Sequence, residues 1–261
     1  MTTIERLRSS GVALALGGGA ARGIAHIGVL KVLAEEGIPV RGVAGTSVGS
    51  VVGAALCAGR DWRWMLDQAR SLRWGTLVKP TVPRMGILAT ERLERYLERS
   101  IGVARFEDLR LPFAAVAVDI GSDEEVVLRS GELAPAIRAS CSVPGIFEPV
   151  ELGGRLLVDG GLLNDVPADV ARTLVGGPVL AVKLNGGARE PSRPRSIVDV
   201  ISSSFAIVAL RTFQQGLAGA DIVVAPDLGR SSYRDLRRVD ELLAAGERAA
   251  RAALAAADRA P

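Results

Sequence analysis

The chain has 261 residues, of which 48% are hydrophobic and 23% are charged, and its formal net charge is +3. This length suits one well-buried α/β domain with at most a subdomain, and the residue balance excludes a disordered or fibrous protein. The arginines are spread along the chain and form no block, so nucleic acid is not an expected partner.

The first half of the chain alternates strands and helices. Val12–Leu16 is an apolar run that predicts a buried strand ending in three glycines, and the apolar periodicity of residues 22–36 predicts a helix closed by a glycine. A second strand at 40–44 leads through a turn at 45–49 into a helix of small residues at 50–58. This order predicts parallel strands joined by right-handed crossovers.

The second half continues the same alternation after an interruption. Residues 60–105, which hold all three tryptophans, are expected to form a helical insertion that serves either as a lid or as ordinary packing. The later elements are expected as strands at 113–120, 125–128, 156–158, 178–184 and 222–225, helices at 132–139, 165–175 and 197–215, and a loop at 186–195. We therefore expect an α/β three-layer sandwich with a mainly parallel central sheet and helices on both faces.

The ends of the chain and its cysteines indicate the compartment. Residues 1–10 form a polar N-terminal extension without the apolar core of a secretory signal, and charged residues interrupt every apolar run before it reaches the length of a membrane span. Cys57 and Cys141 have no metal-ligand spacing and are expected to be buried, reduced thiols. The sequence predicts a cytoplasmic protein without metal or cofactor, with peripheral membrane contact as an open alternative.

Ser47 is the candidate nucleophile. It is the central residue of Gly45-Thr46-Ser47-Val48-Gly49, which fits Gly-x-Ser-x-Gly where a strand meets a helix. Gly45 and Gly49 have no Cβ atoms, which would clash in so sharp a turn. The N-terminus of the following helix points at the site and favours negative charge there. A chain of this composition gives roughly 0.2 such matches by chance, so an ordinary Gly/Ser turn also fits the pattern.

A glycine-rich turn precedes this motif in the chain. Gly17-Gly18-Gly19-Ala20-Ala21-Arg22-Gly23 lies between the first strand and helix, where free amide N–H groups can bind an anion. A dinucleotide site fits poorly, because the central glycine of the fingerprint is absent and the second strand ends in Ala44-Gly45 rather than an acidic residue. An oxyanion hole for acyl transfer suits both turns together.

The chain lacks the histidine that a serine triad requires. Its one histidine, His26, precedes Ser47, whereas the α/β-hydrolase order is serine, acid, histidine. We expect His26 to be a hydrogen-bonded structural residue. Asp159 is the best candidate for the base, because it ends a short apolar strand and Gly160 and Gly161 leave room beside it, although a common Asp-Gly turn has the same pattern.

Four segments follow one another in a fixed order: residues 16–30 (LGGGAARGIAHIGVL), 45–49 (GTSVG), 139–149 (ASCSVPGIFEP) and 159–161 (DGG), the last followed by Asn164 and Pro167. Together they resemble the patatin-like phospholipase family, in the small bacterial form related to the catalytic domain of neuropathy target esterase. The resemblance implies a patatin-like hydrolase domain over residues 11–226, with 227–261 as a C-terminal helical tail. It also implies a lipid acyl-ester substrate, a phospholipid or a lysophospholipid.

The resemblance assigns roles to single residues. Ser47 is the implied nucleophile and Asp159 the base. The backbone amides of Gly18, Gly19 and Ala20 form the implied oxyanion hole, with Arg22 and Gly23 supporting that turn and residues 141–149 shaping the pocket.

Ala20 departs from the family, which usually has glycine there. Alanine keeps its N–H group but is strained if the position needs a positive φ. This departure supports the alternative of a non-catalytic or weakly active lipid- or partner-binding protein on the same fold. A nucleotide-binding oxidoreductase is a third hypothesis, disfavoured by the missing acidic residue.

Overall fold

The computed structural model describes residues 2–82, 84–184, 193–194, 196–229 and 231–259. Its elements in chain order are α1 (Thr3–Ser10), β1 (Val12–Leu16), η1 (Ala20–Gly23), α2 (Ile24–Glu35), β2 (Val40–Thr46), α3 (Val48–Cys57), α4 (Trp62–Ser71), α5 (Trp74–Leu77), β3 (Lys79–Pro80), β4 (Leu88–Ala89), α6 (Glu91–Ile101), η2 (Phe106–Asp108), β5 (Phe113–Asp119), β6 (Glu124–Leu128), α7 (Leu133–Ser140), β7 (Val150–Leu152), β8 (Arg155–Asp159), η3 (Gly160–Leu162), α8 (Ala168–Val175), β9 (Val179–Val182), α9 (Ile197–Gly216), η4 (Leu217–Gly219), β10 (Ile222–Val224) and α10 (Val239–Arg259). Most of the loop expected at 186–195 lies outside the described residues.

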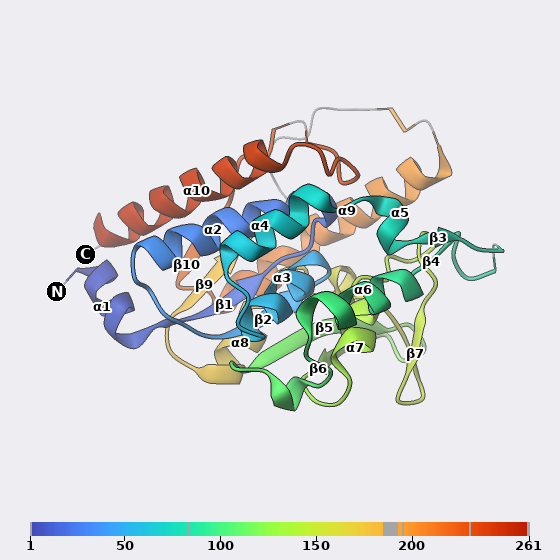
Figure 1. The fold of residues 1–261 in the computed structure, drawn as a ribbon, viewed down its shortest axis with the longest axis horizontal. Helices are drawn as coiled ribbons and strands as arrows, with labels where there is room; N and C mark the ends of the chain where they lie inside the picture. Colours follow the sequence, from blue (N-terminus) through green and yellow to red (C-terminus); the bar gives the residue numbers. More distant parts are fainter. Residues whose placement is uncertain (1, 83, 185–192, 195, 230, 260–261) are drawn as a thin grey trace.

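The central sheet is mixed but mainly parallel, as the sequence predicts. Its strands follow the order β10-β9-β1-β2-β5-β8-β7, with β6 also paired to β5 (Figure 1). Strands β10, β9, β1, β2 and β5 are parallel to one another, whereas β6, β7 and β8 add antiparallel pairs at one side. Helices cover both faces of this sheet, so the expected α/β three-layer class is confirmed.

Alternate residues of β1 point into different layers of the core. Leu14 and Leu16 belong to the larger apolar cluster, which includes residues of α2, α3 and α10. Ala13 and Ala15 belong to a smaller cluster that includes residues of α8. Successive side chains of a strand face opposite sides, so this fully buried strand separates the two helical layers.

Helix α10, which makes up most of the expected tail, packs along α2 (Figure 1). Leu242 and Leu254 are buried in the main core. Two glycines permit the close approach of the helices: a Cβ added at Gly28 would lie 2.1 Å from the Leu243 carbonyl oxygen, and one at Gly246 would lie 2.0 Å from that of Ala25. The tail therefore contributes to the core of the domain.

The expected helix at 165–175 begins only at Ala168. Pro167 disfavours the helical conformation for the residue before it, so residues 163–167 stay outside regular structure after the short η3 turn. This later start leaves Asp165 in a loop beside the glycine-rich turn.

Strands β2 and β8 meet end to end along one edge of β5. Thr46, the last residue of β2, pairs with Val116, and Asp159, the last residue of β8, pairs with the next residue, Ala117. Strand β6 pairs with both stretches of β5 and so occupies the opposite edge. Because β2 is parallel and β8 antiparallel to β5, their C-terminal ends converge and bring Ser47 beside Asp159.

Residues 60–105 form α4, α5 and α6 with a two-stranded ribbon, β3 and β4, between them. Helix α4 packs on α2, and α6 packs on α7. Among the helices of the described residues, none is long and apolar enough to cross a membrane.

Candidate active site

Ser47 occupies a strained turn between β2 and α3. Its φ of 54° and ψ of −127° are unusual for a residue with a side chain. A Cβ added at Gly45 would lie 2.5 Å from the Gly49 carbonyl carbon, and one at Gly49 would lie 2.0 Å from the Leu16 carbonyl oxygen. The two flanking glycines therefore permit backbone contacts that no larger residue would allow.

Ser140, at the end of α7, fixes this turn to the sheet. Its hydroxyl accepts a hydrogen bond from the Ser47 amide at 2.9 Å and donates one to the Val116 carbonyl at 2.6 Å. Val116 is the β5 residue that pairs with the end of β2. No sequence pattern predicts this role for Ser140, because its partners come from segments far apart in the chain.

Asp159 is wholly buried at the end of β8. Its amide donates to the Ser142 carbonyl at 2.9 Å, and its Oδ1 accepts from the Gly161 amide at 2.9 Å. Its Oδ2 has no hydrogen-bond partner within standard distance among the described residues. A Cβ added at Gly160 would lie 2.4 Å from the Val116 carbonyl oxygen, so glycine permits the close return of the chain after Asp159.

Burial raises the pKa of Asp159 from 3.8 to about 7. Desolvation of the charged carboxylate is the largest cause, and the hydrogen bond from the Gly161 amide, together with the nearby Ser47 hydroxyl, partly offsets it. The carboxyl group therefore exchanges its proton near neutral pH.

The three predicted oxyanion donors lie together, but they differ in availability. The Gly18 amide already donates to the Asp165 carbonyl at 3.1 Å. The amides of Gly19 and Ala20 have no hydrogen-bond acceptor in the described parts of the chain, and both residues line a cavity with Ser47 and Asp159. The available pair of donors is therefore Gly19 and Ala20.

Ala20 adopts a left-handed backbone conformation, with a φ of 48°. Such a conformation costs a residue with a Cβ atom roughly 1–2 kcal/mol. The strain expected at this position is therefore present, and the alanine amide is retained.

Arg22 and Gly23 hold the glycine-rich turn against other segments. The Arg22 Nε and Nη2 atoms donate to the Ser231 carbonyl at 3.0 and 2.8 Å, and the guanidinium lies 4.0 Å from the centre of the Tyr233 ring. A Cβ added at Gly23 would lie 2.2 Å from a methyl group of Val48. Arg22 thus ties the turn to the segment before α10.

His26 has the structural environment that the sequence predicts. It is wholly buried, and its Nε2 lies 2.8 Å from the Gly17 carbonyl oxygen. Burial lowers the pKa of His26 to about 4, so the ring is neutral at pH 7 and Nε2–H donates to that carbonyl. His26 anchors the start of the glycine-rich turn.

The two cysteines are free, and one differs from the expectation. Cys57 is buried, as expected. Cys141 remains partly exposed to solvent, because it lines a cavity beside Ser47. Burial raises the pKa of both thiols, and the Asp159 carboxylate contributes for Cys141.

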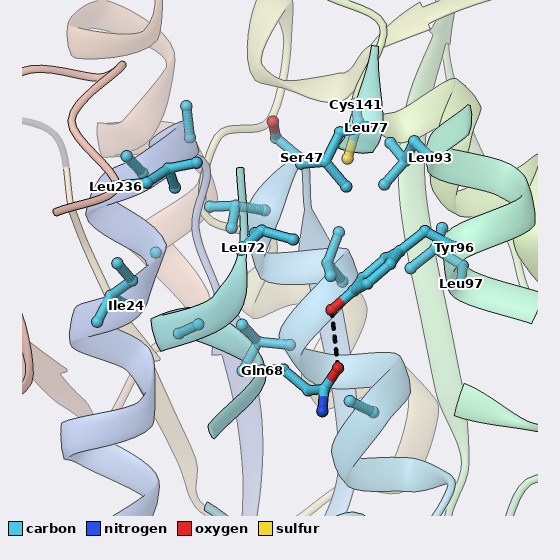
Figure 2. A pocket seen from close by; sticks show the side chains of 18 of the residues that line it. Ile24, Ser47, Gln68, Leu72, Leu77, Leu93, Tyr96, Leu97, Cys141 and Leu236 are labelled. Carbon is cyan, nitrogen blue, oxygen red and sulfur yellow. Dashed lines mark hydrogen bonds between the residues drawn. The ribbon is translucent and has the colours of Figure 1, made fainter. Parts of the chain in front are cut away.

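Two cavities adjoin Ser47. The first, of about 200 Å³, is lined mainly by apolar side chains of α2, α3, α4 and α6, and we call it the apolar cavity (Figure 2). The second cavity, of about 370 Å³, includes Asp159, Asp165 and the glycine-rich turn, together with side chains of α9. Val143 and Phe147, from the predicted pocket segment 141–149, line both cavities.

No group of three or more His, Cys, Asp or Glu side chains lies together closely enough to hold a metal ion within the described ranges. The fold and site define an α/β protein with a serine on a strand-to-helix turn, a buried aspartate and an adjoining glycine-rich turn.

A family model described as patatin-like phospholipase matches residues 14–172, which is more than half of the chain. The chain belongs to the patatin-like phospholipase family, whose members are generally lipid acyl hydrolases.

The relatives and structures that this chain resembles agree with that assignment. An uncharacterized NTE family protein of Mycobacterium tuberculosis is 41% identical over 187 residues, which cover 70% of this chain and 51% of that protein. Patatin-like phospholipase domain-containing protein 6 of Mus musculus is 37% identical over 186 residues, 67% of this chain and 14% of that protein. The chain thus spans about half the length of the first relative and less of the second.

The crystal structure of VipD from Legionella pneumophila shares the fold. Its TM-score is 0.60 at 14% sequence identity, and the alignment covers 94% of this chain and 67% of that chain.

Proposed function

We propose that this chain is a serine acyl-ester hydrolase that acts on lipid esters, phospholipids or lysophospholipids, through a Ser47–Asp159 dyad. One observation carries the proposal: a buried carboxyl group with a pKa raised to about 7 adjoins a serine on a strained turn. A base with a pKa near the working pH combines a useful ionised fraction with a useful proton affinity.

In the acylation step, the Asp159 carboxylate accepts the Ser47 proton while the Ser47 oxygen attacks the ester carbonyl carbon. The carbonyl π electrons move onto oxygen and form a tetrahedral oxyanion. As that intermediate collapses, the bond to the leaving alkoxide breaks and the alkoxide takes the proton from Asp159. The alcohol departs, and the acyl group stays on Ser47.

Deacylation repeats these steps with water. Asp159 accepts a proton from a water molecule that attacks the acyl-enzyme, and the Ser47 oxygen leaves and recovers the proton. The products are the free carboxylic acid and the original enzyme. No other titratable group is required for either half of this cycle.

The Gly19 and Ala20 amides are the proposed oxyanion donors, because both are unpaired among the described residues and both line the second cavity. Removal of one such donor typically costs a factor of 10² to 10³ in kcat. The Gly18 amide holds the Asp165 loop instead. Gly18 still has a spatial role, since a Cβ there would lie 2.7 Å from the Asp165 carboxylate and 3.3 Å from the Ser47 Cβ.

We propose that residues 60–105 form a lid that contacts lipid surfaces. Trp74 and Val78 of this segment line both cavities, which supports the proposal. Val82 and Met85, which lie between β3 and β4, are 73% and 58% exposed, and such apolar side chains favour a membrane interface. Sedimentation with phosphatidylcholine vesicles is expected to be weaker for Val82→Ser/Met85→Ser, and equal binding would contradict the contact.

The second candidate is a weakly active or non-catalytic binding protein, and the strained Ala20 favours it. A fluorophosphonate probe separates the two functions, because it labels only a serine that is activated as a nucleophile. Labelling of wild type but not of Ser47→Ala supports the hydrolase, whereas no labelling of wild type supports the binding protein.

Turnover of p-nitrophenyl esters tests the dyad itself. We expect Ser47→Ala and Asp159→Ala each to reduce kcat by about 10³ or more, with no further loss in the double variant, since the two residues act as a unit. Asp123→Ala, which removes an exposed carboxylate from the turn between β5 and β6, is the matched control and should retain wild-type turnover. Wild-type turnover by Asp159→Ala would contradict the dyad.

A further inference from the structure

Residues 231–234, between β10 and α10, lie against the glycine-rich turn, and we call them the strap. The Ala21 amide donates to the Tyr233 carbonyl at 3.1 Å. The Arg22 Nε and Nη2 atoms both donate to the Ser231 carbonyl, and the Arg22 guanidinium lies over the Tyr233 ring. The strap therefore holds two consecutive residues of the turn by three hydrogen bonds.

The strap is itself anchored to the rest of the domain. Leu228 and Val239, on either side of it in the chain, are buried in the main apolar core. Ser231 is also buried, and its amide donates to the Leu228 carbonyl at 3.1 Å. At the other end of the strap, the Trp74 Nε1 atom donates to the Arg234 carbonyl at 2.7 Å. These anchors allow the strap to hold the turn in one position.

Ala20 is the residue that these contacts constrain. Its φ of 48° is left-handed, and a residue with a Cβ atom keeps such a conformation only where its surroundings enforce it. The bond from the Gly18 amide to the Asp165 carbonyl fixes the chain before Ala20. The bond from the Ala21 amide to the strap fixes the chain after it. The conformation of Ala20 therefore depends on contacts on both sides.

We infer that Arg22 and Tyr233 are positioning residues, which hold Ala20 in its left-handed conformation and so keep its amide directed at the oxyanion. This inference rests on the proposed role of the Ala20 amide as an oxyanion donor. Glycine adopts the left-handed region without strain, so the need for the strap follows from the alanine at this position. The strap contacts and Ala20 should therefore be energetically coupled.

The strain at Ala20 sets the size of the effect. A left-handed alanine is disfavoured by a factor of about five to thirty in population. When Arg22→Ala removes the side-chain bonds to the strap, Ala20 should leave the left-handed region by about this factor, and kcat should fall with it. KM should change little, because the oxyanion forms only after the substrate is bound.

The test is a double-mutant cycle of Arg22→Ala and Ala20→Gly, measured as turnover of p-nitrophenyl esters. Ala20→Gly should raise the kcat of Arg22→Ala about fivefold or more, and should raise that of wild type much less. Arg22→Lys, which keeps a charged donor beside the strap, should lose less activity than Arg22→Ala. An equal effect of Ala20→Gly on wild type and on Arg22→Ala would overturn the inference.

Arg172→Ala is the matched control for the loss of an arginine. The Arg172 Nε and Nη2 atoms also donate to a single carbonyl, that of Gly219, at 3.2 and 2.8 Å. Arg172 lies on α8 and lines neither of the two cavities beside Ser47. Ala20→Gly should change the kcat of Arg172→Ala by the same factor as that of wild type. A rescue as large as in Arg22→Ala would overturn the inference, because the effect would then not depend on the strap.

Urea unfolding distinguishes this inference from the proposed function, because it requires no catalysis. In wild type, Ala20→Gly should lower the unfolding equilibrium constant about two- to fivefold, since it removes the strain. In Arg22→Ala the turn can relax, so the same change should lower the constant by less than about twofold or raise it.

An equal decrease of the unfolding constant in wild type and in Arg22→Ala would overturn the inference even if wild type is an active esterase. The expected difference supports it even if wild type hydrolyses no ester. If Arg22→Ala does not fold, Tyr233→Ala replaces it in both measurements, since it removes the ring beside Arg22 and keeps both strap carbonyls. The same outcomes then support or overturn the inference.

Discussion

Asp159→Asn should make the protein more stable at pH 8 than wild type. The pKa of Asp159 is raised from 3.8 to about 7 by burial, so the ionised carboxylate is disfavoured in the folded state. Between these two pH values, the folded protein keeps a proton that the unfolded chain releases. The unfolding free energy of wild type therefore falls as pH rises from about 4 to about 7.

The magnitude follows from the pKa difference. A change from 3.8 to about 7 corresponds to a total loss of about 4 kcal/mol at pH values above 7. An asparagine carries no charge, and its side-chain oxygen can still accept from the Gly161 amide. The variant should therefore gain several kcal/mol over wild type at pH 8 and almost none at pH 4.

Urea unfolding of both proteins at intervals from pH 4 to pH 8 measures this difference. Asp123→Asn changes an exposed carboxylate and controls for the altered net charge. A stability difference between Asp159→Asn and wild type that stays constant with pH would refute the reasoning, because the folded state would then not raise the pKa of Asp159.

Three further predictions concern the turns around the site. Ser47→Gly should raise the unfolding free energy by about 1–3 kcal/mol in urea titrations, because the φ of 54° at this position is strained only for a residue with a side chain. An equal rise in the unfolding free energy of Ser47→Ala would contradict that cause. Ala20→Gly should raise the unfolding free energy by about 0.5–1 kcal/mol, which is less than the full strain energy because glycine makes the unfolded chain more flexible. It should not reduce ester turnover, and a lower unfolding free energy would contradict strain at the φ of 48°. Ser140→Ala should lower the unfolding free energy by about 1–3 kcal/mol in thermal unfolding and should reduce kcat, because the Ser47 amide and the Val116 carbonyl lose the Ser140 hydroxyl as a partner. An unchanged unfolding free energy and an unchanged kcat would contradict this role of Ser140.

The sequence was sufficient to predict the parts of the site that depend on local geometry. The turn at Ser47 follows from glycines on either side of a serine between a strand and a helix. The isolated, early position of His26 excluded a conventional triad, and the structure gives that residue a buried hydrogen bond to Gly17. Both inferences needed only neighbouring residues and their order.

The remaining features depend on contacts between distant segments. Periodicity predicted the strand that ends at Asp159, but not its antiparallel pairing with β5, which makes it meet β2 end to end. The Gly18 amide was expected to be a free donor, yet the late start of α8 after Pro167 leaves the Asp165 carbonyl within 3.1 Å of it. The Ser140 contacts likewise join segments that lie about 24 and 93 residues away in the chain.

The most direct test of the Ser47–Asp159 dyad is the rate of fluorophosphonate labelling as a function of pH, with the labelled peptide identified by mass spectrometry. We expect one label on Ser47 and a rate that rises with pH to a plateau, with a midpoint near the Asp159 pKa of about 7. In Asp159→Asn the label should form slowly and without that pH dependence. A wild-type rate in Asp159→Asn, or a label on any residue other than Ser47, would contradict the dyad.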